Sequence, residues 1–376
     1  MGVTLADVFR QHAAEYTTRY GSRMLPSHHR AIRSIISCRT EIMGGHVYHC
    51  PDCGETIYHY HSCRNRHCPK CQHGATQKWL ESQQDLLLPV SYFMLTFTLP
   101  EGFRRFARSH QQVIYNLLFR ASAAATKKLS KDPRLIGGKI GMLGILHTWG
   151  RKLVYHPHVH YLVPAGGIDQ DGKWLPVQKN YFLPTKALAK IFRVKFRDGL
   201  KKVDCFDEIP AQVWKQEWVV HCKAVGNGSA VLKYLAPYVF RVAISNKRIV
   251  KMENGKVTFL YKDTNTGKTK ACQLPAWEFI HRFLQHVLPK GFVKVRYYGF
   301  FSPSYRPNLK QLRSQLAQQT DQLHDKLEVE TTRTEYLVCC PVCSKPMVCS
   351  PLEPLHLRGP PPRFVERQML APVLAG

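Results

Sequence analysis

Acidic residues are scarce in this sequence. Its 376 residues include 26 Asp and Glu against 54 Lys and Arg, which gives a formal net charge of +28. A chain with such a field repels itself unless it meets a polyanion, and nucleic acid is the most common one. The composition therefore favours a nucleic-acid-binding protein over a merely basic soluble one.

Long hydrophobic runs are also lacking. The densest apolar stretch, residues 86–99, is interrupted by Pro89, Ser91 and Thr96, so no segment reaches the roughly 18 apolar residues that a membrane span needs. The first thirty residues hold no continuous hydrophobic region and predict no signal peptide. We expect no membrane span, and the cytoplasm is the default location.

A nucleotide-binding P-loop is absent as well. Gly267-Lys268-Thr269 resembles the end of that motif, but position 262 is Lys where the first glycine should stand. We therefore expect no nucleotide cofactor. The stretch Asn265-Thr266-Gly267 is interpreted as a hairpin turn.

The pattern of the chain predicts four parts and a mixed α+β fold. Residues 1–89 form a helical and zinc-binding unit, with helical spacing at 5–20, 28–38 and 72–88. Residues 90–305 form a second unit, with helices at 103–129, 186–203, 211–222 and 229–240 and strands at 92–99, 139–149, 158–163, 242–250, 257–261 and 293–301. Residues 306–350 combine a polar helix over 309–327 with a cysteine cluster, and the proline-rich tail, 351–376, is expected to be disordered.

Nine of the 13 cysteines lie in two clusters with CxxC pairs, at residues 50–71 and 339–349. This usage is typical of metal sites in a reducing compartment. The two pairs of the first cluster predict a tetrahedral zinc site with the ligands Cys50, Cys53, Cys68 and Cys71. Cys63 or a neighbouring histidine is an alternative for one of these ligands.

The second cluster predicts a small C-terminal zinc ribbon. Its ligands would be Cys340, Cys343 and Cys349, with Cys339 or His356 as the candidate fourth. Protein atoms would fill every position of both sites, so both zinc ions are expected to be structural.

Histidines alternate along the predicted strand His156-Pro157-His158-Val159-His160. A side-chain period of two places His158 and His160 on one face and Val159 on the other, so two imidazoles converge on one ion. A divalent ion needs a third ligand. His147, near the end of the preceding strand, is the first choice and His156 the second.

Two tyrosines, Tyr234 and Tyr238, are spaced i,i+4 in a predicted helix, which places both phenols on one face. Alone, such spacing more often indicates a packed core than chemistry, and Pro237 disturbs the helix. Beside a metal-binding histidine pair, the two hydroxyls become candidate nucleophiles that could both reach one phosphate.

Several basic residues are candidate DNA contacts. Arg64 and Arg66 lie between predicted zinc ligands, and Lys247 and Arg248 follow the tyrosine segment. Charged runs such as these, and the one at 193–202, are as often a solvated face, so both interpretations stay open.

Together these residues resemble the HUH-endonuclease transposases of rolling-circle insertion sequences, the group with two tyrosines and an N-terminal zinc-binding region. The resemblance spans most of the chain and rests on the order and spacing of its motifs. They lie at residues 67–71, 95–100, 147–150, 156–160, 234–245, 278–289 and 298–300.

The resemblance implies a central antiparallel sheet flanked by helices, with the histidine pair on a middle strand and the tyrosines facing the metal. It further implies cleavage and rejoining of single-stranded transposon ends. A divalent Mg²⁺ or Mn²⁺ ion would polarise the scissile phosphate, and Tyr234 or Tyr238 would attack it to leave a 5′-phosphotyrosine and a free 3′-hydroxyl.

Three other interpretations stay open. A rolling-circle replication initiator or relaxase shares the metal-and-tyrosine chemistry. The alternating histidines also fit a histidine-triad nucleotide hydrolase, which explains neither the tyrosines nor the cysteines. A non-catalytic zinc-ribbon DNA-binding protein would account for the charge and the cysteines alone.

Overall fold

The computed structural model describes residues 2–71, 79, 82–83, 86–177, 182–203, 206–227, 239, 243–263, 266–319 and 338–355. Within these residues the chain is a mixture of helices and antiparallel sheets, as the sequence pattern predicts. No helix of the described part combines the length and the apolar character that crossing a bilayer requires.

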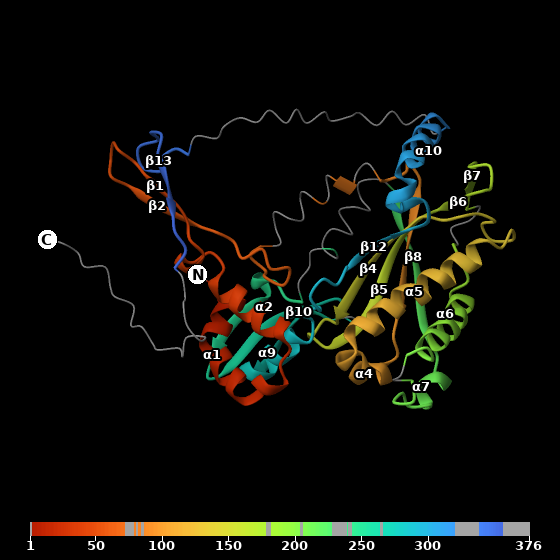
Figure 1. The fold of residues 1–376 in the computed structure, drawn as a ribbon, viewed down its shortest axis with the longest axis horizontal. Helices are drawn as coiled ribbons and strands as arrows, with labels where there is room; N and C mark the ends of the chain where they lie inside the picture. Colours follow the sequence, from red (N-terminus) through yellow and green to blue (C-terminus); the bar gives the residue numbers. More distant parts are fainter. Residues whose placement is uncertain are drawn as a thin grey trace.

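A five-stranded antiparallel sheet forms the largest unit (Figure 1). Its spatial order is β12-β4-β5-β3-β8, and neighbouring strands pair residue by residue, with Thr96 opposite His160 and His147 opposite His158. Directly opposed residues point to the same face of an antiparallel sheet. The strands are β3 (Ser91–Thr98), β4 (Met142–Trp149), β5 (Tyr155–Pro164), β8 (Val219–Asn227) and β12 (Val295–Tyr298).

One face of this sheet packs against helices. Phe93, Leu95 and Phe97 of β3 share a buried apolar cluster with α5 (Gln111–Ser130) and α6 (Thr185–Leu200). Two short helices, α4 (Arg104–Ser109) and α7 (Gln212–Lys215), add Phe106 and Val213 to this cluster. A small hairpin of β6 (Gly166–Ile168) and β7 (Trp174–Pro176) follows β5.

The opposite face carries a second apolar cluster. Leu143 of β4 and Leu162 of β5 pack there with Val239 and with the apolar stripe of α10 (Arg306–Gln319). Because side chains alternate along β4 and β5, His147 and His160 lie on this face too. The histidines therefore do not face α5 and α6.

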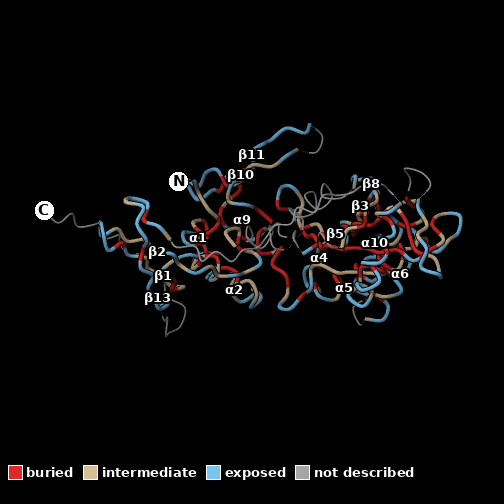
Figure 2. Tube along the Cα trace, turned by 90° about the horizontal axis from the view of Figure 1, so that it is seen from above, coloured by how far each residue is buried: buried red, intermediate tan, exposed pale blue. Residues whose placement is uncertain are grey.

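A third buried cluster joins the N-terminal helices to a later part of the chain. It holds residues of α1 (Leu5–Tyr20) and α2 (Pro26–Ser37) together with β9 (Ile249–Glu253), β10 (Lys256–Lys262), β11 (Thr269–Pro275) and α9 (Ala276–Leu284). The sequence pattern assigned residues 249–284 to the second unit, but their apolar side chains are buried with α1 and α2. Buried residues, red in Figure 2, gather between α1, α2 and α9 and again around the five-stranded sheet.

A small sheet is built from both ends of the described chain. Its order is β13-β1-β2, with β1 (Gly45–His49) between β2 (Thr56–Tyr60) and β13 (Val348–Leu352). Five residues of β13 pair antiparallel with β1, from Gly45 opposite Leu352 to His49 opposite Val348. The C-terminal cysteine segment therefore lies beside the N-terminal one (Figure 1).

Some predicted elements differ from the structure. The helix expected over 211–222 is wrong, because α7 ends at Lys215 and Val219 begins strand β8, which pairs with β3. Pairing along a sheet edge overrides the weak helical spacing there. The strand expected over 242–250 starts only at Ile249, and the helix over 103–129 breaks at His110.

Of the turn predicted at 265–267, the structure describes Thr266 and Gly267, which lie between β10 and β11; Gly267 has a φ of +68°. The tail expected to be disordered from residue 351 is wrong at its start, because Pro351 and Leu352 belong to β13 and pair with β1. The rest of that tail, beyond residue 355, and the helices over 72–88 and 229–240 lie wholly or largely outside the described residues.

Candidate metal centres

Three histidines converge at one end of the five-stranded sheet. His147 comes from β4, and His158 and His160 come from β5. One ligand atom from each lies within 4.8 Å of the other two, and the centroids of the His147 and His160 rings are 4.8 Å apart. The structure thus brings together the predicted pair and its first-choice partner, called here the histidine triad.

Hydrogen bonds orient two of the three imidazoles. Nδ1 of His158 lies 2.6 Å from the carbonyl oxygen of His156, and Nδ1 of His160 lies 2.9 Å from Oγ1 of Thr96. A carbonyl only accepts, so Nδ1 of His158 carries the proton and Nε2 keeps its lone pair. His156, the second-choice ligand, lies outside the triad and contributes this backbone carbonyl.

Burial keeps two histidines of the triad neutral. Removal from water lowers the pKa of His158 to about 3, with the nearby His160 adding to the effect, and lowers the pKa of His160 to about 4. Both rings are therefore unprotonated at physiological pH. With His147 beside them on the same face, these two neutral imidazoles form a donor set suited to a divalent cation.

Tyr234 and Tyr238 lie outside the described residues, but Val239, the next residue, is described. Val239 is buried on the same face of the sheet as the triad. Its carbonyl accepts a hydrogen bond of 3.1 Å from Nζ of Lys294, and that Nζ also lies 5.0 Å from the centre of the Trp149 ring. The Trp149 ring is stacked on His147 at 4.8 Å. A short chain of contacts therefore links the residue after Tyr238 to the triad.

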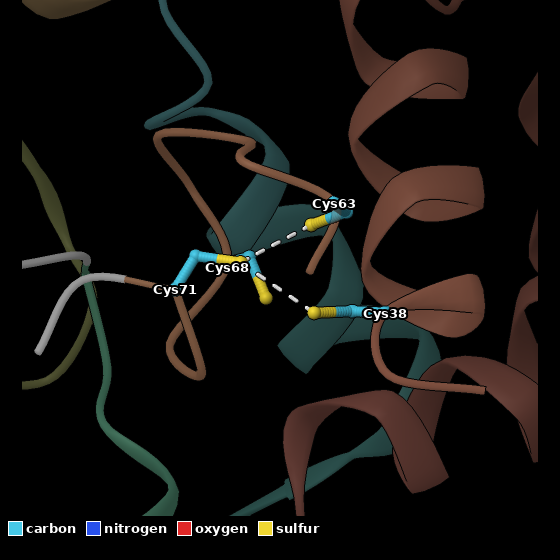
Figure 3. Close-up of side chains that lie close together, drawn as sticks. All are labelled: Cys38, Cys63, Cys68 and Cys71. Carbon is cyan, nitrogen blue, oxygen red and sulfur yellow. Dashed lines mark hydrogen bonds between the residues drawn. The ribbon is translucent and has the colours of Figure 1, made fainter. Parts of the chain in front are cut away.

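Four cysteines form a second centre beside the N-terminal helices (Figure 3). Cys38 follows the last turn of α2, and the other three lie on the loop after β2. The Sγ atom of Cys71 is 3.5 Å from that of Cys38 and 3.5 Å from that of Cys63. Their sulfur atoms can surround one tetrahedral ion. The set is Cys38, Cys63, Cys68 and Cys71.

Four more cysteines meet in a third centre. Cys50 and Cys53 lie on the turn between β1 and β2, and Cys340 and Cys343 lie on the turn that precedes β13. Backbone amides of Cys343 and Val342 face the sulfur of Cys340 and lower the pKa of that thiol to about 7. The four sulfur atoms of this group lie within 4.8 Å of one another, so they can surround one tetrahedral ion.

These groups differ from the predicted ligand sets. Cys50 and Cys53 do not join Cys68 and Cys71, because the β1–β2 hairpin carries the first pair away from the helices while the loop after β2 returns to them. Cys63, the alternative considered from the sequence, is part of the N-terminal group. Cys349 is exposed on β13 and belongs to neither group.

Cys38 is the ligand candidate that the sequence did not reveal. It stands alone, far from any CxxC pair, and only the packing of α2 brings it to the others. The sequence also did not reveal that Cys50 and Cys53 lie beside Cys340 and Cys343. Spacing along the chain does not show which distant turns come together in the fold.

The four candidate DNA contacts divide into two kinds. Arg64, Arg66 and Lys247 are exposed, and Arg248 is half-buried. The guanidinium of Arg66 donates to the carbonyl of Phe292, and that of Arg248 donates to the carbonyls of Leu260 and Arg151. Because these two guanidinium groups already bind backbone carbonyls, Arg64 and Lys247 are better placed to reach a phosphate.

Comparison with known proteins gives two family matches. Residues 141–310 match the family model described as "Putative transposase", and residues 8–99 match the one described as "Transposase zinc-binding domain". The first match includes the triad, and the second includes the N-terminal cysteine group.

Named relatives agree with these matches. The chain is 38% identical to "Putative transposase y4qJ" of Sinorhizobium fredii (strain NBRC 101917 / NGR234), over 91% of this chain and 93% of that protein. It is 29% identical to "Transposase for insertion sequence element IS801" of Pseudomonas savastanoi pv. phaseolicola, over 72% of this chain and 69% of that protein. No solved structure matches the chain.

Proposed function

This chain belongs to the IS91 family of insertion-sequence transposases, and we propose that it cuts and rejoins single-stranded transposon ends through a covalent tyrosine intermediate. The nucleophile is Tyr234 or Tyr238, or each in turn. The five-stranded sheet is the core of an HUH nuclease domain, and the histidine triad holds the catalytic cation.

The convergence of the triad is the observation that carries this proposal. Imidazoles from two paired strands meet at one place, and the hydrogen bond from Nδ1 of His158 leaves its Nε2 free for a metal. Nitrogen donors suit Mn²⁺ better than the harder Mg²⁺, so we expect Mn²⁺ to support the reaction more strongly.

The bound cation would polarise the scissile phosphate and stabilise the charge that develops on it. The phenolic oxygen attacks phosphorus and loses its proton to solvent, and the bond from phosphorus to the 3′ oxygen breaks. That oxygen takes up a proton to become a free 3′-hydroxyl, while the 5′ phosphate stays on the tyrosine. The phosphodiester energy is conserved in this link, so no nucleotide cofactor is needed.

The position of Val239 supports a tyrosine near the triad. Consecutive Cα atoms are about 3.8 Å apart, so Tyr238 starts within that distance of a residue held by Lys294. Lys294 is half-buried and packs on Trp149, which stacks on His147.

The DNA strand would be held mainly through its charge. As a transposase the protein acts on DNA, and its net charge of +28 suits a polyanion. We propose that Arg64 and Lys247, which are exposed, contact the phosphates of the transposon end or target. The N-terminal cysteine group would hold a structural zinc ion that shapes the surface around Arg64.

A covalent-adduct assay tests the proposal. Purified protein is mixed with labelled single-stranded element ends and Mn²⁺, and the products are separated on a denaturing gel. We expect a protein–DNA band that is lost in His158→Ala and in the Tyr234→Phe/Tyr238→Phe double variant. Tyr261→Phe, a matched change on β10, should leave the band unchanged.

The single tyrosine variants show which of the two hydroxyls makes the first cleavage. A band that persists in Tyr234→Phe but not in Tyr238→Phe assigns the first cleavage to Tyr238, and the converse assigns it to Tyr234. A band that persists in the double variant would refute tyrosine chemistry, and no band at all would favour a non-catalytic DNA-binding protein. A replication initiator would give the band but would not move the element in a transposition assay.

A further inference from the structure

The cysteine pairs at the two ends of the chain form a group that neither family match contains in full. Cys50 and Cys53 fall inside the zinc-binding match, which ends at residue 99, whereas Cys340 and Cys343 lie beyond both matches. We call these four residues the composite site. Sγ of Cys50 is 3.4 Å from Sγ of Cys343, and Sγ of Cys53 is 3.5 Å from Sγ of Cys340.

We propose that the composite site binds one structural Zn²⁺ ion, in addition to any ion in the N-terminal cysteine group. This ion would hold the C-terminal strand β13 against the N-terminal hairpin of β1 and β2. The proposal concerns the architecture of the protein and does not depend on the tyrosine mechanism.

The sulfur separations fit a metal and not disulfides. Zinc–sulfur bonds of about 2.3 Å in a tetrahedron put neighbouring sulfurs about 3.8 Å apart, whereas a disulfide needs about 2.05 Å. The composite site has separations of 3.4 and 3.5 Å, and its four sulfurs all lie within 4.8 Å of one another. A small expansion around one ion would complete the tetrahedron.

The two halves of the composite site are built alike. In each, proline follows the first cysteine, and the residue after the second cysteine has a positive φ: +77° at Gly54 and +60° at Ser344. The amide of Gly54 donates to the carbonyl of Cys50 at 3.0 Å, and that of Ser344 donates to the carbonyl of Cys340 at 2.9 Å.

A second pair of bonds repeats in the same way. The amide of Cys50 donates to Glu55 at 2.9 Å, and the amide of Cys340 donates to Lys345 at 2.8 Å. Two turns with the same backbone bonds, facing each other through their sulfurs, are the arrangement of a zinc ribbon. A left-handed conformation at Ser344 is unfavourable for a residue with a Cβ, and a metal that needs this turn gives a reason for it.

The surroundings of the composite site are too small to hold the strands by apolar burial alone. Its buried cluster comprises Cys50, Cys340 and Met347, with a few partly buried neighbours such as Tyr48 and Ile57. Sheets this small are marginal in water without a metal or a disulfide. A zinc ion would supply the missing stability and join segments that are far apart in the chain.

Zinc counting on the full-length protein tests the proposal. We expect the double variant Cys340→Ser/Cys343→Ser to bind one zinc equivalent less than the wild type. The variant Cys50→Ser/Cys53→Ser should also lose one, and the quadruple variant should still lose only one. Cys349→Ser, on the adjoining strand, is the matched control and should lose none.

The retained zinc serves as an internal folding control, because the N-terminal cysteine group keeps its ion only if α2 and the loop after β2 are folded. A loss of two equivalents in the quadruple variant, with one in each double variant, would show that the pairs belong to separate sites. Full zinc content in the Cys340→Ser/Cys343→Ser variant would also overturn the proposal.

Hydrogen exchange tests whether the zinc ion stabilises the pairing of β13 with β1. In the Cys340→Ser/Cys343→Ser variant, amides of β1 should lose protection because β13 no longer pairs firmly with them, while amides of α1 should keep theirs. If a protein that has lost one zinc equivalent keeps the full protection of its β1 amides, the zinc ion does not hold β13 against β1.

Discussion

Removal of one hydroxyl should weaken the catalytic metal site without touching a ligand. Thr96 lies on β3 directly opposite His160, with its Oγ1 2.9 Å from Nδ1 of that ring. If Nδ1 donates this bond, Nε2 carries the lone pair that faces the cation. Thr96→Val keeps the shape of the side chain and removes its only acceptor.

The size of the effect follows from the burial of His160. The ring is 8% exposed, so water cannot easily replace the lost acceptor. Hydrogen-bond partners of ligating histidines typically contribute about 10- to 100-fold in metal affinity. That range corresponds to about 1.4 to 2.8 kcal/mol, comparable with the cost of leaving one buried donor unsatisfied.

The assay is adduct formation as a function of Mn²⁺ concentration. We expect the half-saturating Mn²⁺ concentration of Thr96→Val to rise by about 10- to 100-fold, with most of the rate recovered at saturation. Thr96→Ser retains the hydroxyl and should return the half-saturating concentration close to that of the wild type. A half-saturating concentration for Thr96→Val within twofold of the wild type would refute the role given to this bond, as would a serine variant as weak as the valine one.

Three further predictions concern other parts of the molecule. Burial lowers the pKa of His28 to about 4, so only the unfolded chain takes up this proton between pH 6.5 and 4, and stability falls as pH drops through that window. The fall from pH 7 to 5 should be up to about 2 kcal/mol smaller in His28→Gln, by urea unfolding at both pH values, and an equal fall would contradict the assignment. Lys294→Met removes the Nζ donor to Val239 and should slow adduct formation by about tenfold or more, with partial recovery in Lys294→Gln; an unchanged rate would count against this contact. At Gly299, with φ +60°, an added Cβ would lie 1.7 Å from the carbonyl oxygen of Ile140, so Gly299→Ala should lower stability by at least about 3 kcal/mol in thermal unfolding. Gly291→Ala has a similar φ of +74° but open space and should cost only about 1 kcal/mol; equal costs would rule out the clash.

The histidine triad was accessible from the sequence because its geometry is local. Alternation along one strand places His158 and His160 on one face, and a short connection brings His147 across the hairpin from them. In a hairpin, as in a helical turn, separation along the sequence predicts which residues are neighbours.

The cysteine groups were only partly predictable because their geometry is not local. CxxC spacing identifies a turn that presents two sulfurs, but it does not show which two turns meet. Cys38 reaches its group through the packing of α2, and Cys50 reaches Cys343 through the pairing of β1 with β13. Both depend on tertiary contacts across large sequence distances.

Dependence on distant contacts also explains why residues 249–284 were assigned to the wrong unit. These residues follow the tyrosine segment in the sequence, and their hydrophobic pattern does not indicate which hydrophobic core they join. Their apolar side chains pack with α1 and α2, because each amphipathic element buries its apolar face wherever a complementary face is offered. The short helix α7 and strand β8 show a related effect, since the edge of the large sheet decides the conformation of Val219 and its neighbours.

The position of β1 between β2 and β13 also sets an order of events during synthesis. β2 emerges from the ribosome directly after β1, but β13 is made near the end of the chain. At about 5 to 20 residues per second, β1 would wait roughly 15 to 60 s with one edge unpaired. An unpaired edge can accept a strand from another chain. A gene copy truncated before codon 348 would therefore encode a protein whose β1 stays open, and such a product could capture β13 of an intact chain.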